Sequence, residues 1–116
     1  MNVMVARKRL DEVRDELDRS IAVLNGAHTA HPLVADYPQD PADAGTNLAE
    51  SDRAEAILEA AKARRSLVLE ALSRLEDGSY GTCVDCGGGV PEGRLEAKPE
   101  AARCVKCQAK RDRLRR

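Results

Sequence analysis

Four cysteines in two pairs constrain this chain more than any other feature of its sequence. Seventeen residues separate the first pair from the second, and each pair has two residues between its members. That inner spacing lets both sulfurs of a pair face one ion, so two pairs can complete a tetrahedral four-thiolate shell. Such a shell leaves no coordination position for a substrate water, and zinc suits it. We therefore expect one structural Zn2+ held by Cys83, Cys86, Cys104 and Cys107.

Three other interpretations of the four cysteines compete with zinc. Two disulfides would need an oxidising compartment, but Met1–Leu10 carries three basic residues and no apolar run like that of a secretory signal. A thioredoxin-like redox pair needs a βαβ context, which the sequence does not predict. An iron–sulfur cluster uses four thiolates but usually at other spacings. The paired spacing favours zinc over all three.

The composition is poor in residues that fill a globular core. The 116 residues include no Trp, no Phe and two Tyr, while 34% are charged and 42% hydrophobic. This balance suits long helices packed along a thin seam. No stretch approaches the ~18 apolar residues of a membrane span, so we expect a soluble cytoplasmic protein with no membrane contact.

Charge is unevenly distributed, although the net charge is only −1. Residues 27–59 hold seven acidic and one basic side chain, whereas residues 98–116 hold eight basic and two acidic ones. An acidic middle and a basic end suit contact with two different surfaces of a partner, or are two solvated faces.

Hydrophobic spacing predicts a first helix over about residues 2–25. Steps of three and four between apolar residues are typical of a helix with one narrow buried stripe. Asn25–Gly26 predicts its end, since glycine readily takes the left-handed cap conformation. Three prolines and a glycine then predict a tip loop over about residues 26–46. The stripe consists of Val3, Ala6, Leu10, Val13, Leu17, Ile21 and Leu24.

A second helix is predicted from Thr46 or Asn47 to Glu76. Asn47 and Glu50 have the spacing of a capping pair, and Arg65 interrupts an otherwise apolar stripe. The stripe consists of Ala54, Leu58, Ala61, Val68, Leu72 and Leu75.

Two long helices joined by one loop should form an antiparallel coiled-coil hairpin, in which each covers the stripe of the other. We expect a mainly α fold with this hairpin over residues 1–76. A small four-cysteine zinc finger and a short basic C-terminal helix would follow over residues 77–116.

The finger region closely resembles the DksA/TraR family. The resemblance covers about residues 70–110, with ALSRLEDGSYGTCVDCG at Ala71–Gly87 and matches at Val90–Pro91, Arg94–Pro99 and Cys104–Gln108. It implies a non-enzymatic transcription regulator, a monomer that binds bacterial RNA polymerase without recognising DNA sequence. The coiled coil would enter the secondary channel, while the finger side would rest on the channel rim.

The tip pattern of the family is Asp-x-x-Asp-x-Ala. Asp40, Asp43 and Gly45 look like that tip, with Gly45 where Ala is usual. The resemblance implies that these residues lie near the polymerase active centre. Asp40 followed by Pro41 equally suits a helix N-cap with a proline in the first turn, and capping and polymerase contact can coexist.

Some family members respond to guanosine tetraphosphate. The residues implicated there correspond to Leu67, Lys98 and Gln108, of which only Lys98 is charged. Because a polyphosphate site needs several cations, we expect weak dependence on this nucleotide or none. Contact with the polymerase rim or with a nucleotide is expected of Arg94, Lys98, Lys110 and Arg111.

The main alternative is a zinc-finger protein that binds nucleic acid through its basic C-terminus. The acidic hairpin, the missing aromatic residues and the near-zero net charge argue against it. Binding of DNA or RNA at moderate salt would separate the two hypotheses. The sequence shows neither a catalytic Ser/His/Asp set nor a phosphate-binding glycine loop. We therefore expect that the chain is not an enzyme.

Overall fold

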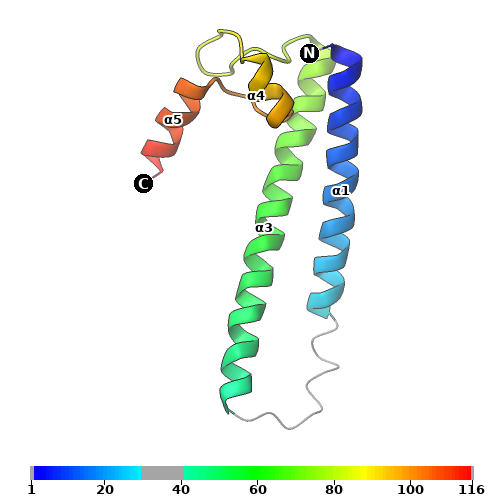
Figure 1. The fold of residues 1–116 in the computed structure, drawn as a ribbon, viewed down its shortest axis with the longest axis vertical. Helices are drawn as coiled ribbons and strands as arrows, with labels where there is room; N and C mark the ends of the chain where they lie inside the picture. Colours follow the sequence, from blue (N-terminus) through cyan, green and yellow to red (C-terminus); the bar gives the residue numbers. More distant parts are fainter. Residues whose placement is uncertain (1, 30–40, 116) are drawn as a thin grey trace. The chain divides into compact units, whose positions relative to one another are not determined.

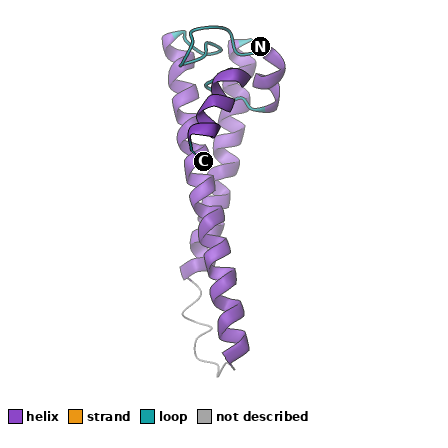
Figure 2. Cartoon of the chain, turned by 90° about the vertical axis from the view of Figure 1, so that its left-hand side faces the viewer, coloured by secondary structure: helices purple, strands orange, loops and turns teal. Residues whose placement is uncertain are grey.

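The computed structural model describes the main chain of residues 2–29 and 41–115, and the side chains of residues 2–26 and 48–115. Within these ranges the chain is helices and loops (Figure 2), and its strand-like pairing is limited to one isolated antiparallel bridge between Thr82 and Gly89. The predicted mainly α fold is therefore confirmed. The helices are α1 (Val3–Thr29), α3 (Pro41–Asp77), α4 (Glu92–Ala97) and α5 (Val105–Leu114) (Figure 1).

Contacts divide the described chain into two compact units. One contains Met1–Arg14 and Ser66–Arg116, and the other is Asp15–Arg65. The first unit joins the start of α1 to the end of α3, and the second joins the end of α1 to the start of α3. This is the antiparallel pairing expected of a helical hairpin. Among the described residues, no helix is both long and apolar enough to cross a membrane.

Helix α1 continues past its expected end. It ends at Thr29 rather than at Asn25, and Gly26 lies inside it. Gly26 is absent from the glycines with positive φ, so it does not form the predicted left-handed cap. A glycine inside a helix costs about 1 kcal/mol relative to alanine. Glycine permits a helix to end but does not force it to, which is why this expected boundary is wrong.

Helix α3 begins earlier than expected, at Pro41 rather than at Thr46 or Asn47. Asn47 and Glu50 lie inside the helix, so the predicted capping pair is wrong. Proline suits the first helical position because its fixed φ is already helical and its missing N–H has no partner to lose there. The alanines that follow are strong helix formers, and they extend the helix into the expected loop.

An aliphatic seam holds the helices together in the first unit. Ala6 and Leu10 of α1 are completely buried, as are Val68 and Ala71 of α3. Each pair is three or four residues apart, which places both side chains on one helix face. Val3 is 54% exposed, so the buried stripe of α1 begins one turn later than expected.

The second unit accommodates the arginine that interrupts the apolar stripe. Arg65 Nε donates a hydrogen bond to Asp18 Oδ1 at 2.6 Å, which joins α3 to α1. Leu17 and Leu58 are the buried aliphatic side chains described in this unit. The polar interruption therefore has an acidic partner on the opposite helix, which periodicity alone did not reveal.

Replacing Leu10 by alanine tests the importance of the seam. Leu10 is fully buried, so the L10A variant should lose about 2–5 kcal/mol of unfolding free energy, measured by urea denaturation with helical circular dichroism. Met4 is 79% exposed on the same helix, and M4A should change stability by less than about 0.5 kcal/mol. Equal losses in both variants would contradict the proposed seam.

Candidate metal centre

The end of α3 delivers the chain directly into the cysteine-containing segment. Gly78 has φ +85°, a conformation that L side chains rarely adopt. The main-chain N–H groups of Ser79 and Tyr80 then donate to Arg74 O, at 3.0 and 3.2 Å. This arrangement satisfies a carbonyl of the last helical turn and reverses the chain, as in a Schellman motif.

The first cysteine pair lies in a tight main-chain turn. Cys83 N donates to Gly88 O at 2.7 Å, and Gly87 N donates to Cys83 O at 3.0 Å. Gly87 has φ +75°, which only glycine adopts readily. Gly88 N also donates to Cys86 Sγ at 3.4 Å. The turn therefore presents both sulfurs of the pair while its own N–H groups are hydrogen bonded.

The second pair is positioned by the start of α5. Cys104 is the N-cap residue, with an extended backbone, and its carbonyl accepts a hydrogen bond from Gln108 N at 2.9 Å. Cys107 therefore lies in the first turn of the helix. A main-chain hydrogen bond of 3.0 Å from Val84 N to Ala102 O connects the two pairs.

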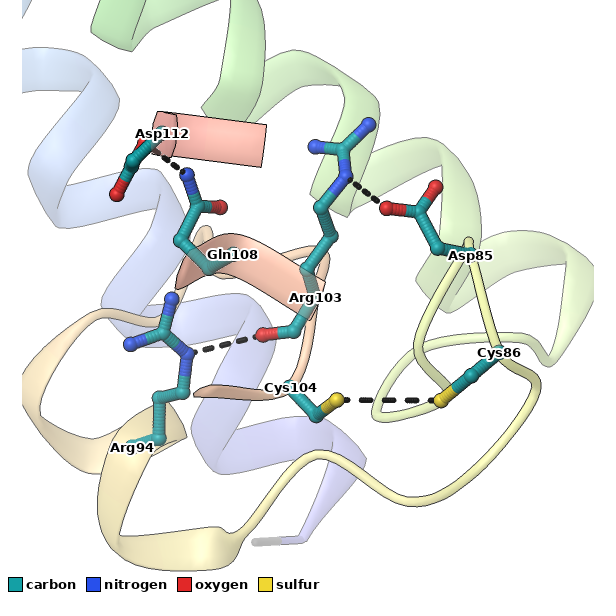
Figure 3. A network of polar contacts seen from close by, with 7 residues as sticks. All are labelled: Asp85, Cys86, Arg94, Arg103, Cys104, Gln108 and Asp112. Atoms are coloured by element: carbon teal, nitrogen blue, oxygen red, sulfur yellow. Dashed lines mark hydrogen bonds and ion pairs between the residues drawn. The ribbon is translucent and has the colours of Figure 1, made fainter. Parts of the chain in front are cut away.

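All four sulfurs converge on one point. The Sγ atoms of the four cysteines lie within 4.8 Å of one another, and Cys86 Sγ is 3.9 Å from Cys104 Sγ (Figure 3). Sulfurs bound tetrahedrally to zinc at ~2.3 Å would be about 3.8 Å apart. The arrangement therefore fits a four-thiolate zinc site, and the four residues that spacing singled out are brought together.

The electrostatics of the cluster also fit a divalent cation. Main-chain N–H groups of Cys86 and Cys104 lower the pKa of Cys83 to about 6. The main-chain N–H of Cys107 lowers the pKa of Cys104. Hydrogen bonds with Cys104 and Cys83 instead raise the pKa of Cys107 to about 12. Four adjacent thiols do not all ionise unaided near neutral pH, and the charge of a metal ion favours the missing ionisation.

A small apolar cluster supports the sulfurs. It consists of Cys83 with three buried side chains, and Tyr80 packs against it from the entry segment. Tyr80 Oη donates to Pro99 O at 2.9 Å, and partial burial raises the pKa of this phenol. The three other buried members are Val90, Leu95 and Ala101.

Helix α4 supplies Leu95 to this cluster and was missed from the sequence. Its six residues are too short to show a hydrophobic period. Its signals were Pro91, which stands at the N-cap position, and Glu92 in the first turn.

A polar network outside the sulfurs was also missed. Arg103 Nε donates to Asp85 Oδ2 at 2.7 Å, and Arg94 Nε donates to Arg103 O at 2.9 Å (Figure 3). Gln108 Nε2 donates to Asp112 Oδ1 at 3.0 Å, one turn along α5. The Arg103–Asp85 contact joins a residue next to Cys104 to a residue next to Cys86. The sequence offers no local signal for this contact.

Most of the predicted basic contact residues line one cavity in the first unit. Arg94, Lys98 and Arg111 line a cavity of about 600 Å³, whereas Lys110 does not. The cavity wall also includes Leu67 and Gln108, two of the positions associated with nucleotide response in the family. Its remaining lining residues are Glu70, Glu100, Ala101, Ala102, Arg103, Asp112 and Arg115.

The predicted tip residues are only partly covered by the structure. Asp40 lies outside the described residues. Asp43 and Gly45 belong to the first turns of α3, but the side chain of Asp43 is also outside the described part of the chain. The start of α3 at Pro41 agrees with the interpretation of this proline as a first-turn residue.

Known proteins share both parts of this architecture. Residues 78–113 match the family described as prokaryotic dksA/traR C4-type zinc finger. The RNA polymerase-binding transcription factor DksA of Caulobacter vibrioides is 30% identical over 106 residues, covering 91% of this chain and 70% of that protein. The protein of the same name from Escherichia coli K12 is 26% identical over 98 residues, covering 84% and 60%.

A solved structure has a similar fold. Transcription factor DksA2 from Pseudomonas aeruginosa superposes with a TM-score of 0.57 at 25% identity, over 93% of this chain and 86% of that chain. The similarity therefore extends beyond the finger into the helices. With its cysteine cluster, its helical hairpin and these relatives, the chain belongs to the DksA/TraR family.

Proposed function

We propose that this chain is a non-enzymatic transcription regulator that binds bacterial RNA polymerase. The observation that carries the proposal is the 106-residue similarity to a protein named as an RNA polymerase-binding transcription factor. This similarity covers 91% of the chain, so it includes the hairpin as well as the finger. Because bacterial RNA polymerase works in the cytoplasm, we propose that the chain is located there.

In this proposal, one zinc ion has a structural role. The four cysteines would provide all four ligands, and a closed thiolate shell stabilises the finger without offering a site for substrate. The finger holds few apolar side chains, so metal binding would supply much of its folding free energy.

The hairpin tip would act inside the secondary channel of the polymerase. Support comes from the Asp40, Asp43 and Gly45 pattern and from its position at the start of α3, the second of the two long helices in the chain. Carboxylates at a narrow tip are suited to engaging cationic groups near the active centre. We propose that the chain acts there as a monomer and does not recognise DNA sequence.

Removing the metal should unfold the finger and leave part of the hairpin. A chelator should accelerate tryptic cleavage between Arg94 and Lys110, while part of the helical circular dichroism persists because the second unit has its own seam. Adding zinc back should restore protection. Complete collapse of the helical signal on chelation would contradict this division.

Neutralising the tip should separate binding from regulation. We expect Asp40→Asn/Asp43→Asn to bind cognate core polymerase as the unmodified chain does but to lose its effect on abortive initiation. Asp52→Asn/Glu55→Gln is a matched control, since it removes the same charge from exposed positions further along α3. Failure of the unmodified chain to bind polymerase, with binding to DNA or RNA at moderate salt, would overturn the proposal.

Guanosine tetraphosphate should change the transcriptional effect little. Only Lys98 is basic among the three family positions, and Leu67 cannot contact a phosphate by charge. Abortive initiation with and without the nucleotide measures this dependence. A large nucleotide effect that disappears in Lys98→Ala would contradict the expectation.

A further inference from the structure

Outside the sulfur atoms, an ion pair bridges the two halves of the metal centre. Asp85 lies between the cysteines of the first pair, and Arg103 immediately precedes the second pair. Their contact, Arg103 Nε to Asp85 Oδ2 at 2.7 Å, joins residues 18 positions apart in the chain. Figure 3 shows this contact beside the approach of Cys86 Sγ to Cys104 Sγ. The ion pair therefore spans the boundary that must open when a bound metal leaves.

Hydrogen bonds to the main chain fix both peptide groups that flank the Cα atom of Arg103. Arg94 Nε donates to the carbonyl of Arg103 at 2.9 Å, and Ala102 O accepts a hydrogen bond from Val84 N at 3.0 Å. The Arg103 side chain is only 17% exposed, whereas that of Asp85 is 43% exposed. Because the arginine is already ordered, little further conformational entropy is lost when it pairs with the carboxylate.

Charge gives this pair a second effect on the site. Two positive charges on zinc against four thiolates leave an excess of two negative charges. Asp85 adds another negative charge within the first cysteine turn, and Arg103 places a cation next to it. The guanidinium therefore both offsets local repulsion and connects the two cysteine pairs.

We propose that Arg103 is a positioning residue that, through Asp85, keeps the two cysteine pairs together and slows the release of zinc. The proposal rests on zinc binding by the four cysteines, as proposed above. Groups beyond the metal ligands commonly change metal affinity by roughly 10- to 100-fold, because they orient the ligands. The pair contributes here by resisting separation of Cys83 and Cys86 from Cys104 and Cys107.

The test is the rate at which the zinc-loaded full chain transfers its metal to an excess of chromogenic chelator. Arg103→Gln and Asp85→Asn should each release zinc roughly tenfold faster than the unmodified chain. The double variant should release it no faster than Arg103→Gln alone, since that change already removes the interaction. Arg103→Lys retains the charge and should recover part of the lost retention.

Arg65→Gln is the matched control. It removes a contact of the same type, Nε to a carboxylate at 2.6 Å, from the unit that contains no cysteines. Its zinc release should equal that of the unmodified chain. Zinc content and helical circular dichroism, measured before release, establish that each variant is folded and loaded.

Salt provides a further test, because release from the unmodified chain can be compared at low and high salt. The pair is partly exposed, and at 1 M salt the Debye length falls to about 3 Å. Zinc release from the unmodified chain should therefore become faster as salt rises. Release from Arg103→Gln, which lacks the ion pair, should change less. Salt-independent release from the unmodified chain would contradict the proposal.

The two proposals fail in different ways. If the full chain binds no zinc, the metal site and the role of Arg103 are both wrong. If one zinc binds but the single variants release it at the unmodified rate, or their effects add in the double variant, only the role of Arg103 is wrong.

Discussion

The convergence of four sulfurs is the constraint on which the rest of the finger depends. Helices α4 and α5 have six and ten residues, and isolated helices of that length are marginal in water. The apolar cluster beside the sulfurs has four buried members and no Phe or Trp. Modules this small usually need a metal or a disulfide to fold. Ligation would therefore set the positions of both short helices.

The finger is connected tightly to the helix that precedes it. The carbonyl of Arg74 accepts two main-chain hydrogen bonds from the residues that follow α3, and Tyr80 then bonds to Pro99. The same compact unit also contains the first residues of α1. Loss of order in the finger would thus reach the base of the hairpin, while the second unit keeps its own contacts between α1 and α3.

Sequence spacing was sufficient for the features that repeat locally. Paired cysteines predicted the cluster, and steps of three and four predicted two long antiparallel helices, because both patterns follow from fixed backbone geometry. Helix ends were harder, since Gly26 and Pro41 permit helix continuation and helix start without requiring either. Family resemblance, not periodicity, supplied the polymerase partner.

The contacts that sequence reasoning missed join distant parts of the chain. The Arg103–Asp85 pair joins residues 18 positions apart, and Leu95 of α4 belongs to the same buried cluster as Cys83. No local pattern identifies the partner of an exposed charge, because many geometries are compatible with the same sequence. Arg94, Lys98 and Arg111, three of the four predicted rim and nucleotide residues, likewise gained a shared location in one cavity only in three dimensions.

The Asp18–Arg65 contact has a consequence for the alignment of the two helices. A seam built from Ala, Leu and Val alone repeats aliphatic side chains at each helical turn, so a polar contact beside it adds information about the alignment of the two helices. The Arg65–Asp18 pair lies partly exposed beside the seam and favours the observed alignment, because its 2.6 Å contact would be lost if the helices slipped. We infer that this ion pair helps to hold the observed alignment of α1 and α3 within the second unit.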